Sequence, residues 1–144
     1  KCDENTLLAK EAYAFQFNSD CRGESVFRPQ AQGRPGLQPQ IPTTLPTYDE
    51  IIGRNGVNRE NYNDHLISLL KPGQPNILTI HAEAEGRSCL PMFSQFMEKT
   101  KSLGAKFVPL SQLLPPDLST IPAGRIEAKT FPGREGWMAV QAPA

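Results

Sequence analysis

The feature that most constrains the fold of this chain is the alternation of helical patterns with short apolar runs. Apolar side chains recur at helical spacing over residues 58–70 and again over residues 90–103. Each of these segments is followed by a short apolar run, residues 76–80 and 105–109, with the length and composition of a buried strand. Helices that alternate with buried strands indicate βα units and a parallel sheet. The sequence therefore predicts an α/β fold.

The other segments complete this pattern only in part. They predict a helix over residues 3–13, a strand at 15–17, a long loop at 23–40, a short edge strand at 41–45, a helical turn at 111–114 and an irregular tail over 118–144. Four strands and three helices are too few to close a barrel, so we expect residues to be missing upstream of Lys1. The open edges at residues 15–17 and 105–109 would favour a homo-oligomer.

The composition limits the classes of function. Fifteen basic residues balance fifteen acidic ones among 144, so no overall field attracts nucleic acid or anionic lipid. Three widely spaced cysteines argue against a disulfide framework and for a reducing compartment. No apolar run approaches the roughly 20 residues that cross a bilayer. We therefore expect a cytoplasmic domain whose recognition is local.

Chemically active side chains follow two of the predicted strands. Asp20 and Arg22 come after residues 15–17, while His81, Glu83 and Glu85 come after residues 76–80. Functional groups gather at the carboxyl ends of parallel strands, because the loops there converge. Asp20 could hold the imidazole of His81 and favour its charged form. His81 is therefore a candidate general acid.

Structural explanations compete with this hypothesis. His81 could cap its strand and Asp20 could start a turn. Glu83 and Glu85 share a strand face with His81 if the strand continues, so the three could form a metal cluster, although solvated loop carboxylates are more common at such positions. His65 lies beside an apolar helix face and is expected to be structural. Cys21, His81 and Cys89 lack the close spacing of zinc ligands.

Five segments in one order resemble the polysaccharide deacetylase (NodB) family. They are Phe17-Asn18-Ser19-Asp20-Cys21-Arg22-Gly23, the run from Ile41 to Thr47, the run from Thr79 to Gly86, Pro109-Leu110-Ser111 with Leu113-Leu114, and Pro132-Gly133-Arg134-Glu135-Gly136-Trp137. The first and last of these are similar to the sugar deformylases of the family rather than to its chitin or peptidoglycan deacetylases.

The resemblance implies that this chain is the C-terminal half of a distorted (β/α) barrel of the NodB type. Residues 1–117 would belong to the barrel and residues 118–144 would form a tail packed on it. The divalent metal ion of the intact enzyme, and the residues that bind it, would lie in the missing N-terminal half, so no metal ligand is expected here. His81 would protonate the departing amine, and Asp20 would tune His81.

The implied reaction removes a formyl group from a formamido sugar linked to undecaprenyl phosphate, in the lipid A modification that gives polymyxin resistance. Arg22, Glu83 and Glu85 would contact this substrate at the cytoplasmic side of the inner membrane. Arg28 and Arg34 could bind its phosphate, or be ordinary surface residues. Trp137 and Met138 could enter the membrane interface, although packing is favoured.

Two other functions stay open. One is a NodB-type deacetylase of another amino sugar, which a comparison of formyl and acetyl substrates would distinguish. The other is a non-catalytic carbohydrate-binding module, since the sequence has no evident metal site of its own.

Overall fold

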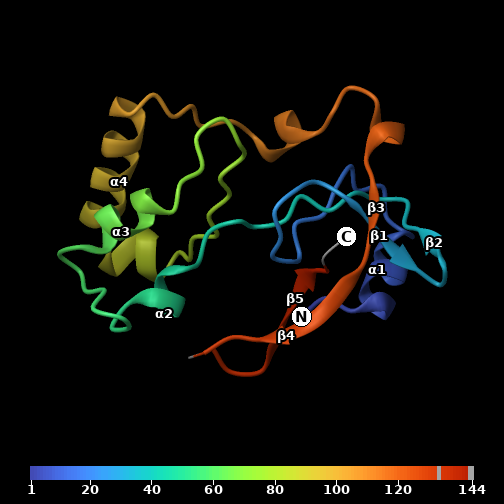
Figure 1. Ribbon diagram of the computed structural model, residues 1–144, viewed down its shortest axis with the longest axis horizontal. Coiled ribbons are helices and arrows are strands. Elements are labelled where there is room, and N and C mark those ends of the chain that lie inside the picture. The colour runs from blue at the N-terminus through green and yellow to red at the C-terminus, as the bar shows by residue number, and fades with distance from the viewer. Residues whose placement is uncertain (133, 143–144) are drawn as a thin grey trace. The chain divides into compact units, whose positions relative to one another are not determined.

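A computed structural model of the chain describes residues 1–132 and 134–142. These residues form two compact units, one made of Lys1–Thr44 with Pro109–Ala144 and the other of Leu45–Val108 (Figure 1). Both helices and small sheets are present, so the fold mixes α and β structure as the sequence predicts. Gly133, in the last family-like segment, and residues 143 and 144 of the tail lie outside the described residues.

The first unit begins with helix α1 (Glu4–Lys10), which is shorter than the predicted helix over residues 3–13. Asp3 is its N-cap, and Asp3 Oδ1 accepts a hydrogen bond from the N–H of Thr6 at 2.8 Å. The chain then turns at Ala12 and Tyr13 without entering a strand, so the strand predicted at residues 15–17 is absent. Phe15 is 50% exposed there, and stacks on Tyr13 with 5.7 Å between ring centroids.

The segment predicted as a long loop contains a small hairpin. Strands β1 (Arg28–Ala31) and β2 (Arg34–Pro35) pair antiparallel, and β1 also pairs parallel with β3 (Ala123–Gly124). Gln32 and Gly33 join β1 to β2 with φ of 51° and 73°. Two consecutive positive φ values give the turn whose twist suits a two-residue hairpin. The loop prediction was wrong here, because abundant Pro and Gly obscured the turn.

The prediction of an irregular tail was also wrong. Strands β4 (Ile126–Thr130) and β5 (Trp137–Gln141) form an antiparallel pair in register from Ile126 opposite Gln141 to Thr130 opposite Trp137. Two 3-10 helices, η2 (Leu110–Leu113) and η3 (Leu118–Thr120), precede them, and η2 confirms the predicted helical turn. The core of this unit is one cluster of buried residues, against which Ile126 and Trp137 pack: Cys2, Leu7, Cys21, Phe27 and Ala139.

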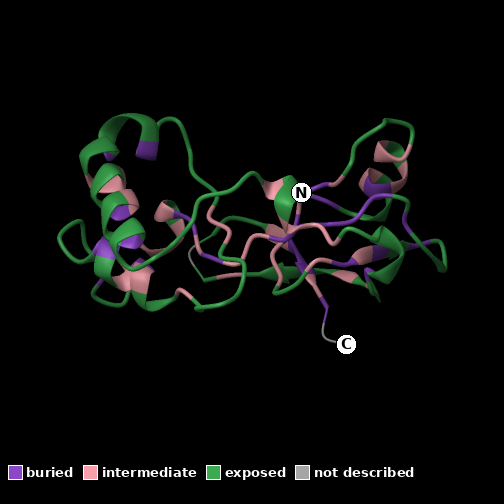
Figure 2. Ribbon diagram, turned by 90° about the horizontal axis from the view of Figure 1, so that it is seen from above, coloured by how far each residue is buried: buried purple, intermediate pink, exposed green. Residues whose placement is uncertain are grey.

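The second unit is helical. It contains α2 (Tyr48–Ile51), α3 (Tyr62–Ser68), the π-helix η1 (Ala84–Ser88) and α4 (Leu90–Ser102). Both helices predicted from periodicity are present as α3 and α4. Pro91 lies in the first turn of α4, and Gly104 follows its end with φ of 89°, as the capping pattern predicts. Buried positions alternate with exposed ones along α3 and α4 (Figure 2), and the buried cluster comprises Leu45, Val57, Tyr62, Leu66 and Phe96.

The two apolar runs predicted as buried strands in this region form no strand. Residues 76–80 and 105–109 join no named sheet, and Ile80, Phe107 and Val108 are 48%, 50% and 45% exposed. Apolar and β-branched composition favours a strand only where a partner supplies the ladder of hydrogen bonds. Without strands at 15–17 and 105–109, the argument for an oligomer through their edges has no basis in these segments.

Candidate functional site

Two of the family-like segments lie side by side in the first unit. Residues 18–23 run parallel to residues 40–43 through isolated bridges. The N–H of Ile41 donates to the carbonyl oxygen of Asn18 at 2.8 Å, and the N–H of Thr43 donates into the same segment at 2.9 Å. Sequence order alone does not predict this pairing. The pairing holds the backbone on either side of Asp20, at Asn18 and at Cys21, by hydrogen bonds.

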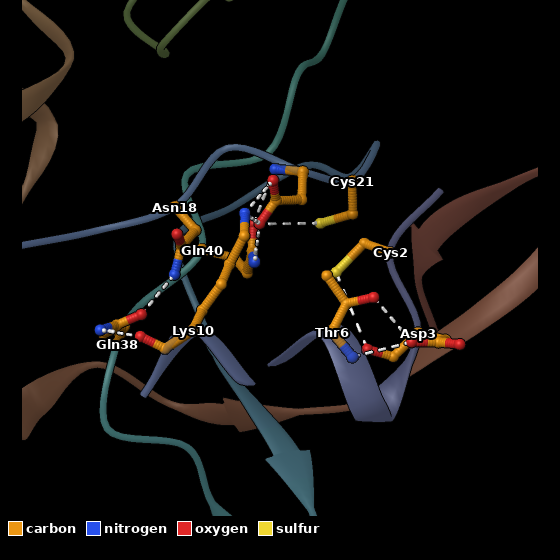
Figure 3. A network of polar contacts seen from close by, with 9 residues as sticks. Cys2, Asp3, Thr6, Lys10, Asn18, Cys21, Gln38 and Gln40 are labelled. Atoms are coloured by element: carbon orange, nitrogen blue, oxygen red, sulfur yellow. Dashed lines mark hydrogen bonds and ion pairs between the residues drawn. The ribbon is translucent and has the colours of Figure 1, made fainter. Parts of the chain in front are cut away.

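The carboxylate of Asp20 is fully engaged within this unit. Lys10 Nζ donates to its Oδ1 at 2.6 Å and to its Oδ2 at 2.7 Å. Gln40 Nε2 also donates to Oδ2 at 3.1 Å, while Gln40 Oε1 accepts the backbone N–H of Asp20 at 2.9 Å. Figure 3 shows the side chains of Lys10 and Gln40 close to one another. Because the Gln40 side chain is fully buried, it is a fixed frame for the orientation of Asp20.

A second buried amide joins the end of α1 to the same segment. Gln38 Oε1 accepts a hydrogen bond from Asn18 Nδ2 at 2.8 Å, and Gln38 Nε2 donates to the carbonyl oxygens of Lys10 and Tyr13 at 3.0 and 2.6 Å. Asn18 and Gln38 are both buried, and Figure 3 shows the hydrogen bond between their side chains. Their bonds satisfy polar groups that would otherwise destabilise the unit.

Arg22 is attached to the end of β5. Its N–H donates to Ala139 O at 2.9 Å, and its carbonyl oxygen accepts from the N–H of Gln141 at 2.7 Å. Its guanidinium carbon lies 5.9 Å from the ring centroid of Phe131, a cation–π geometry. Arg22 is therefore held at its backbone and oriented at its side chain.

The other two candidate arginines are bound by protein groups. Arg34 pairs with both carboxylate oxygens of Glu11, at 3.1 and 2.7 Å, and Arg28 Nη2 donates to Leu118 O at 3.1 Å. The bidentate pair lowers the pKa of Glu11 and raises the pKa of Arg34. Arg34 would have to leave Glu11 in order to bind a phosphate.

Two buried thiols lie next to the Asp20 network. Burial, followed by the charge of Asp20, raises the pKa of Cys2 to about 11, and burial raises the pKa of Cys21 to about 12. Both thiols are therefore neutral at physiological pH. All three cysteines are free.

His81 lies in the second unit, at the start of a helical turn rather than on a strand. Its carbonyl oxygen accepts the N–H groups of Ala84 and Glu85 at 3.1 and 3.0 Å. Its own N–H donates to Glu85 Oε2 at 2.8 Å. The residue itself is exposed to solvent. The backbone of His81 is thus fixed while its imidazole stays open to a ligand.

Several polar side chains gather around the start of α4. Arg59 Nη2 donates to Cys89 Sγ at 3.4 Å and to the carbonyl oxygen of Ser88 at 2.9 Å. Burial raises the pKa of Cys89, but hydrogen bonds from Arg59, Ser88 and Tyr48 outweigh it and leave the pKa below its ordinary value. The phenol of Tyr62 is also buried here, and burial, followed by the charge of Glu85, raises its pKa.

The structure distributes the predicted site residues between its two units. Asp20 and Arg22 belong to the first unit, while His81, Glu83 and Glu85 belong to the second. The contact between Asp20 and His81 therefore stays a prediction. Glu83 is exposed and Glu85 is 2% exposed, so the two carboxylates do not share the environment that a continued strand would give them. His65 is half-buried within α3.

The described residues do not fit a metal site. No group of three His, Cys, Asp or Glu side chains in residues 1–132 and 134–142 is arranged to hold a metal ion. Glu85, which the sequence places in a cluster with His81 and Glu83, instead accepts the His81 N–H. We therefore assign no metal ligand among these residues.

The environment of Trp137 favours packing over exposure to a membrane. Its ring packs against the core of the first unit and lines a cavity of about 290 Å³, and Lys1 Nζ lies 5.7 Å from the ring centroid. Among the described residues, no helix has the length and apolar character needed to cross a bilayer.

Sequence reasoning did not identify Lys10, Gln38 or Gln40 as parts of the site. Lys10 is ten residues from Asp20, and the two glutamines lie in a segment interpreted as loop. The sequence gives one indication that Gln40 belongs to the site, because this polar residue lies between Pro39 and the apolar Ile41.

The chain is similar to two curated proteins that carry the same name. It is 42% identical over 142 residues to the "Probable 4-deoxy-4-formamido-L-arabinose-phosphoundecaprenol deformylase ArnD" of Shewanella sediminis (strain HAW-EB3). The aligned region covers 99% of this chain and 45% of that protein. It is 41% identical over 135 residues to the protein of that name from Wigglesworthia glossinidia brevipalpis, with 92% of this chain and 46% of that protein covered. No protein-family model matches the chain.

These similarities agree with the resemblance of the chain to sugar deformylases, here to proteins named ArnD. The chain spans about half the length of the curated relatives it matches.

Proposed function

We propose that this chain is part of a metal-dependent hydrolase that removes the formyl group from 4-deoxy-4-formamido-L-arabinose-phosphoundecaprenol. The observation that supports this most strongly is 42% identity over 142 residues to a protein named for that reaction. A second relative with the same name agrees at 41%. The product would serve lipid A modification and polymyxin resistance at the cytoplasmic face of the inner membrane.

The fold we propose for the intact protein is a distorted (β/α) barrel of the NodB type, with this chain as its C-terminal half. Residues 1–117 would belong to the barrel and residues 118–144 would pack on it. The alternation of helices with short apolar segments, and the chain's span of about half its relatives, support this proposal. By the family resemblance, the residues that bind the metal would lie in the other half.

The chemical role of this chain in the proposal is proton donation. An amine leaves a tetrahedral intermediate readily only when its nitrogen receives a proton. His81 has the required features, an imidazole open to solvent on a backbone held by hydrogen bonds at both its N–H and its C=O. Asp20 would favour the charged form of that imidazole in the intact site.

Substrate contacts follow the same assignment. Arg22 carries a guanidinium oriented over Phe131, and such a group binds a phosphate through parallel N–H donors. Glu83 is exposed two residues after His81 and could accept hydroxyl hydrogens of the sugar. These roles distinguish the proposal from a binding module, because they place the phosphate and the reacting amide on different segments.

A hybrid protein tests the proposal. This chain would replace the matching 142 residues of the Shewanella relative, and formate release from the lipid-linked formamido sugar would be measured. We expect His81→Ala to lower the chemical step by about 10²- to 10⁴-fold, the usual contribution of a positioned acid. His65→Ala is the matched control, because the chain has two histidines and His65 lies within α3.

Near-normal turnover by His81→Ala would show that His81 is not the acid. The same hybrid with the corresponding acetamido sugar separates the deformylase from a deacetylase of another amino sugar. We expect the isolated chain to release no formate even with added divalent metal, and formate release above a buffer control would contradict that part of the proposal.

A further inference from the structure

The strongest unassigned feature of the second unit is the buried carboxylate of Glu85. Only 2% of this residue is exposed, yet nearby Glu83 is exposed to solvent. A carboxylate is rarely buried without a partner, because the loss of water costs several kcal/mol. The position of Glu85 therefore calls for a specific interaction.

That interaction is with the backbone of His81. Glu85 Oε2 accepts the N–H of His81 at 2.8 Å, and the N–H of Glu85 donates to the carbonyl oxygen of His81 at 3.0 Å. The reciprocal pair resembles a capping box, in which a glutamate reaches back to the first residue of a helical turn. Hydrogen bonds to an ionised carboxylate are shorter and stronger than neutral ones. One glutamate thus fixes both polar groups of the His81 backbone.

The other carboxylate oxygen of Glu85 makes no such hydrogen bond. Glu85 Oε1 is buried without a hydrogen-bond partner among the described residues, as is the hydroxyl oxygen of Tyr62 on α3. The charge of Glu85 contributes to the raised pKa of Tyr62, so the two side chains interact electrostatically. Tyr62 stays protonated and neutral beside the carboxylate.

We propose that Glu85 is a positioning residue for His81, which sets the direction from which the imidazole reaches the leaving amine. The inference rests on the proposed function, since it assumes that His81 is the acid. The burial of the Glu85 carboxylate favours this role over the direct substrate contact predicted from the sequence. A displacement of a catalytic side chain by about 1 Å can lower the rate by about 10²-fold.

The first test uses amide hydrogen exchange in the chain itself, and needs no activity. We expect Glu85→Ala to remove the protection of the His81 N–H, whereas Glu85→Gln retains it, because the amide oxygen of glutamine still accepts that hydrogen. Glu98→Ala is the matched control, since Glu98 is exposed on α4. Unchanged protection in Glu85→Ala would overturn the proposed hydrogen bond.

The second test uses formate release by the hybrid protein. We expect Glu85→Ala to lower kcat by about 10- to 100-fold with KM within about 2-fold, and Glu85→Gln to recover most of that loss. If His81→Ala is inactive but Glu85→Ala keeps normal kcat, the positioning role is wrong. If His81→Ala is active, the proposed function fails while the exchange test still decides the geometry.

Should Glu85→Ala fail to fold, Glu85→Gln decides the question. A folded glutamine variant with wild-type kcat supports positioning through the hydrogen bond. A folded glutamine variant that loses as much activity as His81→Ala overturns it, because the acceptor oxygen is then insufficient.

Discussion

Replacing Gln40 by methionine removes the two side-chain hydrogen bonds between Gln40 and Asp20, and it changes the volume of the core only slightly. In the native chain the Gln40 side chain accepts the N–H of Asp20 at 2.9 Å and donates to its carboxylate at 3.1 Å. The backbone of Gln40 also pairs with Phe27, through hydrogen bonds of 3.2 and 2.8 Å. Methionine keeps this backbone pairing, so the substitution tests the side-chain bonds alone.

The structure gives the size of the expected effect. An N–H left without its partner costs about 1–3 kcal/mol when buried, and a hydrogen bond to a charged group contributes about 1.5–3 kcal/mol. The Asp20 side chain is 23% exposed and keeps Lys10, so water and the ammonium group offset part of the loss. We therefore expect Gln40→Met to lower the free energy of unfolding by about 2–4 kcal/mol.

Urea unfolding followed by tryptophan fluorescence measures this change. Trp137 is the single tryptophan and packs in the same unit as Gln40, so it reports the unfolding of that unit. Gln16→Met is the matched control, because Gln16 is exposed in the same unit and should change stability by less than about 0.5 kcal/mol. A Gln40→Met variant within about 0.5 kcal/mol of the native chain would refute the reasoning.

Two further predictions concern the same neighbourhood. Lys10→Met should cost less than about 1 kcal/mol, and less than Gln40→Met, because the Lys10–Asp20 pair is partly exposed and screened; a larger loss in the same urea assay would contradict this. The pKa values of Cys2 and Cys21 rise on folding from 9.0 to about 11 and about 12, so the folded chain binds more protons than the unfolded one above pH 9. The stability that the two neutral thiols contribute should therefore be constant below about pH 8 and be lost as pH rises from about 9 to about 11 for Cys2 and about 12 for Cys21, by at most about 1.4 kcal/mol per pH unit for each thiol. Urea unfolding at a series of pH values checks this, and Cys21→Ala should flatten the decline; an unchanged slope in that variant would show that Cys21 is not its source.

The helices of the second unit were predictable because their pattern is self-contained. A helix makes its hydrogen bonds within its own segment, so apolar spacing predicts it locally. Tyr62 and Leu66 are buried on α3 as their spacing predicts, whereas on α4 the buried residues are Phe96 and Thr100, and Phe93 and Met97 are only half-buried. Caps are equally local, and Gly104 occupies the predicted position after α4. Helix α4 is therefore found close to its predicted boundaries, whereas α3 begins at Tyr62 and ends at Ser68, inside the predicted range of 58–70.

Strands were predicted poorly because their hydrogen bonds depend on other segments. The runs at residues 76–80 and 105–109 have strand-like composition but belong to no named strand, although the N–H of Leu45 donates to the carbonyl oxygen of Ile77 at 3.1 Å. Conversely, β1 contains Pro29 and begins at Arg28, yet it pairs with both β2 and β3. A proline is tolerated in a strand where its missing N–H has no acceptor to satisfy. Composition alone does not reveal that arrangement.

The residues of the candidate site differ in the same way, because some are recognisable from local sequence and others depend on contacts between distant segments. Asp20 and His81 could be named from sequence because each belongs to a short polar segment after an apolar run. Lys10 and Gln40 could not, since they reach Asp20 only after α1 and residues 40–43 have come together. Networks of side chains from distant segments are properties of the fold.

The pairing of family-like segments in the first unit has a consequence for how they are interpreted. Residues 18–23 pair with residues 40–43, so two of the similar stretches support one another physically, and Arg22 also bonds to Ala139 and Gln141 of β5. Substitutions there should affect stability first and activity through it. His81 differs, because its imidazole is exposed while Glu85 holds only its backbone. A His81 variant that loses activity at unchanged stability therefore reports on chemistry, which makes it the more discriminating position for testing the proposed reaction.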